Sequence, residues 1–254
     1  MKVGSLFSGI GGIDLGLERA GMTIAWQVEK DAWCRKILTK HWPEVPKYDD
    51  VQTLQPEALE PVDLLAGGFP CQDLSVAGKR AGIIEGARSG LWGEFARLVR
   101  AIRPQYLFVE NVAGLLIQPG LGVVLGDLAE CGYDAEWQVL SAAAFGAPHA
   151  RRRIWIVAYP YGKPSAFCVF PRHSRQTTKW HIKKKEWGED WFKSEVGATA
   201  TVCIQDQHVS ESRLVGVSDG IPLLLDRIRG LGNAVVPQIV EWIGRQIVRP
   251  SRKG

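Results

Sequence analysis

The chain has 254 residues, of which 46% are hydrophobic and 23% charged, and its formal net charge is +4. This composition is typical of a globular protein with one sizeable core and a small appended domain. No apolar run approaches the ~20 residues of a membrane span, and the first residues lead into a strand pattern without a cleavable signal. We therefore expect a cytoplasmic protein that makes no membrane contact.

The first 160 residues alternate strand and helix patterns. Strands are predicted at 3–7, 23–28, 62–66, 105–109, 134–140 and 153–158, and helices at 12–20, 31–41, 89–102 and 122–131. This alternation predicts an α/β fold, with a mostly parallel sheet and helices on both faces. Periodicity is lost from about residue 160 to 225, and an amphipathic helix follows at 232–248. We therefore expect a first domain at 1–159, a small irregular domain at 160–225, and a C-terminal segment at 226–254 that packs back on the first.

A glycine-rich turn joins the first predicted strand to the first helix, with the sequence Phe7-Ser8-Gly9-Ile10-Gly11-Gly12. Glycines let the backbone approach a ligand, and a helix N-terminus offers N–H groups and the positive end of a dipole. Glu29 closes the second strand about 20 residues later, where an acid can bind a ribose diol. The pattern predicts a nucleoside cofactor and leaves both a dinucleotide and S-adenosylmethionine open.

A second cluster carries reactive groups at strand ends. Cys71 follows a buried strand and the tight turn Gly67-Gly68-Phe69-Pro70, and a thiolate on an accessible loop can act as a nucleophile. Glu110 follows the strand at 105–109 and is expected at the same edge of the sheet. Arg151 and Arg153 share one face of an extended segment, so both guanidinium groups can bind a phosphate or a base carbonyl.

Together, these motifs resemble those of the DNA cytosine-5 methyltransferases, and the compact layout is similar to the phage and prophage branch. The resemblance rests on five motifs in the family's order: residues 6–12, Pro70-Cys71-Gln72, Glu110-Asn111-Val112, 149–153 and 232–235. His149 stands where the family usually has glutamine, and Lys30 where some relatives place an aromatic residue. The resemblance implies a Rossmann-like, S-adenosylmethionine-dependent methyltransferase sheet, with 1–159 as the cofactor-binding and catalytic domain and 160–225 as a target-recognition domain.

The resemblance also implies roles for single residues. The expected reaction moves a methyl group from S-adenosylmethionine to C5 of a flipped-out cytosine in duplex DNA. Cys71 would attack C6, Glu110 would bind N3 and the exocyclic amine, and Arg153 would contact O2. Arg151 would position the Cys71 loop or a phosphate. The residues expected around the cofactor are Phe7, Gly9, Ile10, Gly11, Gly12, Glu29, Asp50, Pro70, Leu91 and Asn233.

The expected partner is double-stranded DNA, bound by a monomer that is encoded by a bacterium or phage, and a cognate restriction endonuclease is a further expected partner. Three alternatives stay open: an RNA cytosine-5 methyltransferase acting on tRNA, a DNA-binding relative without turnover, and an NAD-linked oxidoreductase. No metal is expected, because the spacing of Cys168, His173, His181, Cys203 and His208 matches no common zinc site. Five cysteines without a CxxC motif also argue against a disulfide framework.

Overall fold

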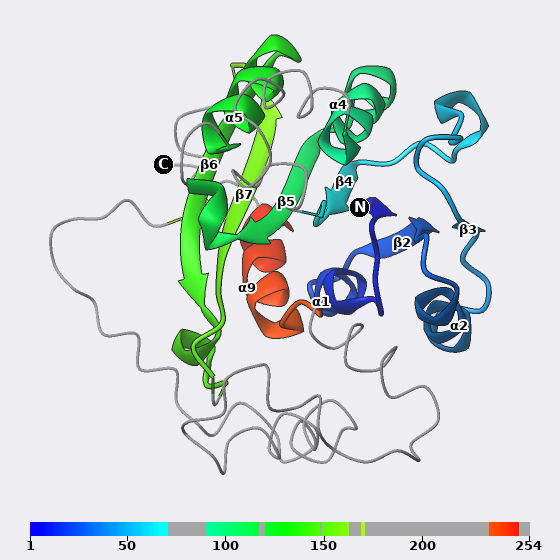
Figure 1. Ribbon diagram of the computed structural model, residues 1–254, viewed down its shortest axis with the longest axis horizontal. Coiled ribbons are helices and arrows are strands. Elements are labelled where there is room, and N and C mark those ends of the chain that lie inside the picture. Colours follow the sequence, from blue (N-terminus) through cyan, green and yellow to red (C-terminus); the bar gives the residue numbers. More distant parts are fainter. Residues whose placement is uncertain (71–89, 117–119, 148, 163–168, 171–233, 249–254) are drawn as a thin grey trace, which may run out of the picture.

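The computed structural model describes residues 1–70, 90–116, 120–147, 149–162, 169–170 and 234–248. These residues form a seven-stranded sheet in the order β3-β2-β1-β4-β5-β7-β6 (Figure 1). The strands are β1 (Lys2–Leu6), β2 (Thr23–Val28), β3 (Lys47–Tyr48), β4 (Leu64–Gly67), β5 (Tyr106–Val112), β6 (Tyr133–Ser141) and β7 (Arg152–Pro160). Neighbours from β3 to β5 pair in parallel, and β7 runs antiparallel to both β5 and β6. The predicted α/β class with a mostly parallel sheet is confirmed.

Helices cover both faces of this sheet (Figure 1). The α-helices are α1 (Gly12–Arg19), α2 (Ala32–His41), α4 (Leu91–Ile102), α5 (Gly120–Glu130) and α9 (Pro237–Val248), and the short 3-10 turns are η1 (Pro56–Ala58), η3 (Ala113–Leu116) and η4 (Ala142–Phe145). Leu107 and Val109 of β5 join the core under α4 and α5, whereas Phe108 joins the core under α1 and α9. Successive strand residues point to opposite faces, so a central strand covered on both sides carries an unbroken apolar run, here from Tyr106 to Val109.

The last described helix, α9, packs directly on α1. A Cβ atom at Gly16 would lie 2.4 Å from Cβ of Val240, and a Cβ atom at Gly244 would lie 2.7 Å from Cβ of Ala20. Only glycine permits such close approach of two helix backbones. The segment before α9 also reaches the head of α1, because a Cβ atom at Gly12 would lie 2.7 Å from the Val235 carbonyl oxygen.

Several local predictions differ from the structure. The helix predicted from residue 232 begins at Pro237, whose fixed φ suits the first helical position, and 234–236 are not helical. The two-residue strand β3 was not predicted, because two residues carry no periodicity. Glu110 lies inside β5 instead of after it, because it pairs with Trp155 of the antiparallel β7. The first strand ends at Leu6, one residue before the left-handed Phe7.

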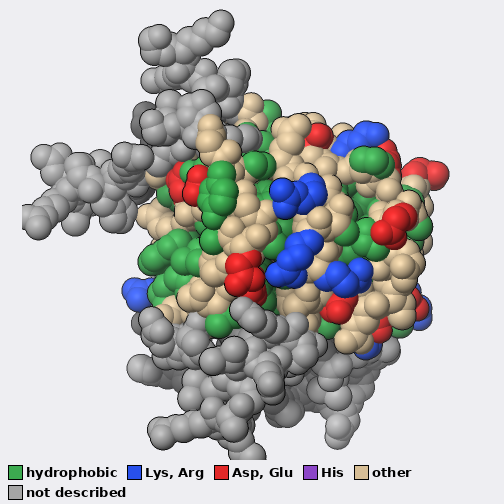
Figure 2. All heavy atoms as spheres, turned by 90° about the horizontal axis from the view of Figure 1, so that it is seen from above, with side chains coloured by type: hydrophobic (Ala, Val, Ile, Leu, Met, Phe, Trp, Pro, Cys, Tyr) green, Lys and Arg blue, Asp and Glu red, His purple; other side chains and the backbone are tan. Residues whose placement is uncertain are grey.

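The face at the amino ends of the parallel strands carries mixed charge. Figure 2 views the molecule from above Figure 1, and Lys and Arg side chains lie among Asp and Glu over the described part of this face. Among the helices that the structure describes, none combines the length and apolar character needed to cross a bilayer. Of the predicted second domain, only residues 160–162 and 169–170 are described, so that domain stays a prediction.

Candidate active site

The candidate residues gather at one edge of the sheet. Strands β2, β1, β4 and β5 are adjacent and parallel, so their carboxyl ends meet at this edge. The turn after β1, Glu29 after β2, Pro70 after β4 and Glu110 near the end of β5 therefore lie along it. Strand β7 runs the other way and begins there, with Arg153 opposite Val112. Ligands of open α/β sheets bind outside the carboxyl ends of the strands.

The glycine turn is open at Gly9 and tightly packed at Gly11. Phe7 has φ 52°, a left-handed conformation that costs a non-glycine residue on the order of 1–2 kcal/mol. Gly9 is also left-handed, and a Cβ atom placed on it would meet nothing within 4 Å. At Gly11, by contrast, a Cβ atom would lie 2.4 Å from the Trp42 ring. The backbone of the turn is thus accessible at Gly9, as the approach of a cofactor requires.

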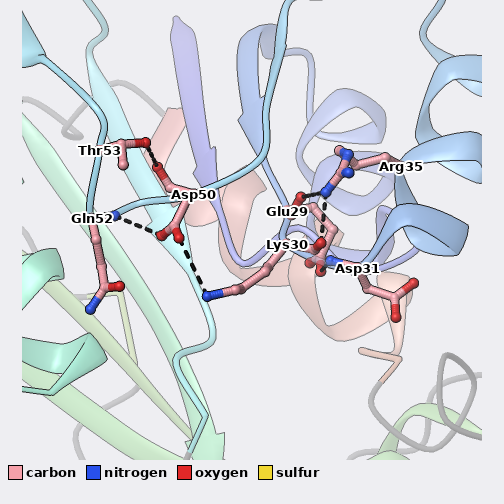
Figure 3. Close-up of polar contacts among 7 residues, drawn as sticks. All are labelled: Glu29, Lys30, Asp31, Arg35, Asp50, Gln52 and Thr53. Carbon is pink, nitrogen blue, oxygen red and sulfur yellow. Dashed lines mark hydrogen bonds and ion pairs between the residues drawn. The ribbon is translucent and has the colours of Figure 1, made fainter.

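Glu29 is fixed against this turn. Its Oε2 accepts a hydrogen bond from the Gly9 N–H at 2.7 Å, and its Oε1 accepts one from the Asp31 N–H at 2.8 Å. Nη1 of Arg35 donates to the backbone carbonyls of Glu29 and Lys30, at 2.7 Å each (Figure 3). Asp31 caps α2 by accepting from the Cys34 N–H at 2.9 Å. The carboxylate is therefore held in one place, where its remaining lone pairs can accept from a ribose diol.

Asp50 supplies a second acidic acceptor, just beyond β3. Its Oδ1 accepts from the Gln52 N–H at 3.0 Å, and its Oδ2 lies 3.3 Å from Nζ of Lys30. Figure 3 shows Lys30 extended toward Asp50, away from Arg35. The Gln52 N–H, and after it Lys30, hold the pKa of Asp50 below its ordinary value. A charged acceptor at this position fits an exocyclic amine such as that of adenine.

Glu110 and Arg153 form a buried ion pair across β5 and β7. Nε of Arg153 lies 3.0 Å from Oε1 of Glu110, whose side chain is only 10% exposed. Burial raises the pKa of Glu110 above its ordinary value, and the positive charges of Arg153 and Arg151 oppose that shift. A Cβ atom at Gly68 would lie 2.8 Å from Oε2 of Glu110, so the glycine makes room for this carboxyl group. A carboxyl group with raised proton affinity suits a partner that binds a ring nitrogen and shares its proton.

Asn111 links the loop after β4 to β5, the strand that carries Glu110. Its Nδ2 donates to the Phe69 carbonyl at 3.0 Å, and its Oδ1 accepts from the Val112 N–H at 2.8 Å. Asn111 is buried, whereas Pro70, the next residue along the loop, is exposed. This contact was not predicted, since the sequence places Asn111 in a motif but does not show what its amide reaches.

The remaining predicted site residues are either partly buried beside the site or outside the described residues. Leu91 opens α4 and packs, partly buried, against the core. Arg151 is partly buried, and its charge acts on both Glu110 and His149. Burial, and after it Arg151, lowers the pKa of His149. Ile10 lies in the glycine turn, partly buried. Cys71 and Asn233 lie outside the described residues, as do the five histidines and cysteines considered for zinc.

A buried polar network beneath the turn was also not predicted. It consists of Ser5 on β1, Ser8 in the turn, Asp14 on α1 and Gln27 on β2, all of them buried. The sequence carries one signal for it: Asp14 lies beside Ile13 and three residues before Leu17, on the face of α1 that is otherwise apolar. A charged residue on a core-facing stripe is unusual and indicates a buried partner.

Comparison of the sequence with known proteins finds one family and several bacterial relatives. The family model of the C-5 cytosine-specific DNA methylases matches residues 1–211. Type II methyltransferase M.NgoFVII of Neisseria gonorrhoeae is 32% identical over 91% of this chain and 60% of its own length. Type II methyltransferase M2.BsuMI of Bacillus subtilis is 38% identical over 68% of this chain and 46% of its own length. The chain thus spans roughly half of the length of these curated relatives.

Comparison of the structure with solved structures finds the same fold. One described as a DNA modification methyltransferase encoded within an Escherichia coli prophage aligns with a TM-score of 0.61 and 19% identity, covering 97% of this chain and 98% of that one. The Spodoptera frugiperda DNMT2 structure aligns with a TM-score of 0.55 and 22% identity, over 63% of this chain and 50% of its own. At these identities the likeness concerns the fold, and it confirms the predicted methyltransferase-type sheet.

Proposed function

Because the chain belongs to the C-5 cytosine-specific DNA methylase family, we propose that it methylates C5 of cytosine in duplex DNA, with S-adenosylmethionine as the methyl donor. The observation that supports this most directly is the placement of Glu110 and Arg153. Their ion pair lies at the same edge of the sheet as Glu29 and the glycine turn, next to the loop that leads to Cys71. A base bound by Glu110 and Arg153 would therefore lie near a cofactor bound by Glu29 and the glycine turn.

The proposed cofactor site uses the turn and the two acids beside it. The cofactor supplies an activated methyl group on a sulfonium. Glu29 would accept hydrogen bonds from the ribose diol, and Asp50 one from the adenine amine. The open space beside Gly9 would admit the cofactor. The N–H groups at the start of α1 would then face the carboxylate of the cofactor. Phe7, Ile10, Gly11, Gly12, Pro70, Leu91 and Asn233 would complete the site.

In the proposed chemistry, Cys71 and Glu110 act on the same cytosine. The Cys71 thiolate adds to C6, forming a carbon–sulfur bond at the expense of the C5–C6 double bond and making C5 nucleophilic. Once C5 carries the methyl group, loss of the C5 proton to a base and elimination of the Cys71 thiolate restore the double bond. Glu110 binds N3 and the exocyclic amine and stabilises the protonated ring. Arg153, already paired with Glu110, contacts the O2 carbonyl, and Arg151 positions the loop of Cys71 or a phosphate. The base must leave the helix stack to reach these groups.

The proposed partners follow from the same chemistry. The substrate is duplex DNA, and residues 160–225 would read the bases around the target from the major groove. We propose that a monomer binds the DNA. Both curated relatives named above are called Type II methyltransferases, which supports a cognate restriction endonuclease as a further partner.

The proposal is tested with the purified protein, tritiated S-adenosylmethionine and either plasmid DNA or tRNA. We expect label in DNA but not in tRNA, and bisulfite sequencing of the plasmid should locate methylated cytosines in a defined sequence context. Label confined to tRNA would favour the RNA alternative, and label in neither would leave only a relative without turnover.

Cys71→Ser should abolish methyl transfer while cofactor binding stays unchanged, because an alcohol is a far weaker nucleophile than a thiolate. Duplex DNA with 5-fluorocytosine at the target should trap the wild type, but not the variant, as a covalent complex on denaturing gels. The matched control is Cys131→Ser, a buried cysteine of the described core. Full activity of the Cys71 variant would reject the assignment.

A further inference from the structure

Asp14 is a completely buried carboxylate that the proposed chemistry does not use. It lies in the first turn of α1, with none of its surface exposed. Its Oδ1 accepts from Nε2 of Gln27 at 2.8 Å, and its Oδ2 accepts from the Ser5 hydroxyl at 3.1 Å. Burial raises the pKa of Asp14 to about 6, and the hydrogen bonds from Gln27 and Ser5 limit that shift. Near neutral pH the group is therefore charged in spite of its burial.

A chain of hydroxyl groups links this carboxylate to the glycine turn. The Ser8 hydroxyl donates to Oγ of Ser5 at 2.9 Å, and the Ser5 hydroxyl donates to Asp14. The backbone of Ser8 also helps to hold the glycine turn. Its N–H donates to the Val28 carbonyl at 3.1 Å, and its carbonyl accepts from the Gly11 N–H at 2.9 Å. Asp14 can only accept, so it fixes the direction of the Ser5 hydroxyl and leaves Oγ of Ser5 to accept from Ser8. The Ser8 hydroxyl also lies 3.2 Å from the Ser5 carbonyl oxygen and 3.4 Å from the Val28 carbonyl oxygen.

The network also reaches the second half of the proposed cofactor site. Gln27, which donates to Asp14, lies on β2 two residues before Glu29. Glu29 in turn accepts from the Gly9 N–H. Asp14 therefore lies between the two segments that approach the proposed cofactor, the turn after β1 and the end of β2, and holds a side chain of each strand.

We propose that Asp14 is a positioning residue, whose charged carboxylate orients Ser5 and Ser8 and so holds the turn from Gly9 to Gly12 ready for the cofactor. This inference rests on the proposed function, because it assigns the turn to cofactor binding. When Asp14 takes up a proton, one of its two oxygens becomes a donor. The carboxyl group then no longer accepts from both Ser5 and Gln27, and the order of the network is lost.

Few other charges in the described structure act on Asp14. Glu18 on the same helix opposes its ionisation, and Lys47 on β3 is attracted to it. Lys47 donates to the Trp42 and Val45 carbonyls. On α9, which packs against α1, Glu241 and Arg245 pair with each other, and Arg245 also donates to the Arg19 carbonyl at the far end of α1.

The experiment is calorimetry of S-adenosylmethionine binding to the full-length protein between pH 5 and pH 8. The wild type should bind about tenfold more weakly at pH 5 than at pH 7.5, the scale of one hydrogen bond. Asp14→Asn should bind about tenfold more weakly at pH 7.5 and lose most of the pH dependence. Glu57→Gln is the matched control, a carboxylate-to-amide change at an exposed residue on η1 that does not act on Asp14, and should keep the wild-type profile.

Two further measurements keep the inference testable if Asp14→Asn does not fold. Ser8→Ala interrupts the hydroxyl chain above Asp14 and should also flatten the pH profile. Hydrogen exchange without cofactor should show faster exchange of the Gly9 and Gly11 amides at pH 5 than at pH 7.5, after correction for intrinsic rates, in the wild type alone.

The outcomes separate the two proposals. Wild-type affinity and pH profile in Asp14→Asn, or in Ser8→Ala if the first variant is unfolded, would overturn the role of Asp14 and leave the proposed function intact. A wild-type protein that binds no S-adenosylmethionine at any pH would overturn both.

Discussion

At the scale of single residues, the pairing of Glu110 with Arg153 leads to a test of the base-binding site. Glu110→Gln keeps the shape of the side chain but removes its charge, and leaves the Arg153 guanidinium without its carboxylate partner. Loss of a general acid or base typically lowers turnover by 10²–10⁴-fold, so we expect kcat to fall at least about a hundredfold. S-adenosylmethionine binding should change little, because Glu110 lies on β5, beyond β4 from the glycine turn.

Initial rates of methyl transfer and calorimetry together check this expectation. Glu94→Gln serves as the control, because Glu94 also pairs with an arginine, Arg97, but within α4. A Glu110→Gln variant with the turnover of the control would show that the buried pair is structural only.

Glu29 leads to a second test at the same scale. Glu29→Ala removes the proposed ribose acceptor and also the acceptor for the Gly9 and Asp31 N–H groups. We expect S-adenosylmethionine binding to weaken by roughly 1–3 kcal/mol, the range of charge-assisted hydrogen bonds. Calorimetry measures the loss, with the exposed Glu57→Ala on η1 as control. Unchanged affinity in Glu29→Ala would reject the proposed cofactor position.

At the scale of secondary-structure elements, the contact between α1 and α9 depends on glycine. In Gly16→Ala the new Cβ atom would lie 2.5 Å from the Pro237 carbonyl oxygen as well as close to Val240, so α9 must move. Overpacking of this kind costs roughly 1–3 kcal/mol of unfolding free energy. Gly126→Ala on α5 is the matched control, because a Cβ atom there would meet nothing within 4 Å.

Denaturant unfolding of both variants checks this prediction. The control should gain about 0.5–1 kcal/mol, because alanine favours the helix over glycine. If Gly16→Ala is as stable as Gly126→Ala, the two helices can separate without cost and the contact is not important for stability.

At the scale of the whole molecule, Asp14 makes stability depend on pH. Its pKa rises from 3.8 in the unfolded chain to about 6 in the folded protein. The folded state therefore binds the proton more tightly than the unfolded chain, so protonation of Asp14 stabilises the fold. This contribution to the unfolding free energy is complete below pH 3.8 and is lost as pH rises through about 6. The difference corresponds to on the order of 3 kcal/mol.

Comparison of Asp14→Asn with the wild type isolates that contribution, since other groups titrate in both proteins. The unfolding free energy of the variant, relative to the wild type, should increase between pH 4 and pH 7. A difference that stays constant across this range would contradict the raised pKa. A variant that is more stable and yet binds cofactor more weakly would show that the buried charge is retained for function.

The sequence predicts most of the described sheet and of its helices, and the failures of prediction have physical reasons. Alternating apolar periods locate the strands and helices around the glycine turn and Glu29, because these patterns are local. The partnership of Glu110 with Arg153 is not local: it depends on the antiparallel direction of β7, which places Arg153 beside Val112 and two residues from the partner of Glu110. The partners of Asp14, Ser5 and Gln27, likewise depend on how α1 lies on β1 and β2, which periodicity does not specify.

The contact between α1 and α9 joins the two ends of the chain, so during synthesis α1 must wait for α9 to be made. Arg245 on α9 donates to the Arg19 carbonyl, and the two residues are 226 positions apart in the chain. A ribosome adds about 5–20 residues per second, so α1 emerges roughly 10–45 s before the helix that covers it. Throughout this interval, Ile13 and Leu17 are without their covering partner. The nascent chain therefore presents an apolar surface that chaperones can bind, and slow translation would prolong that exposure.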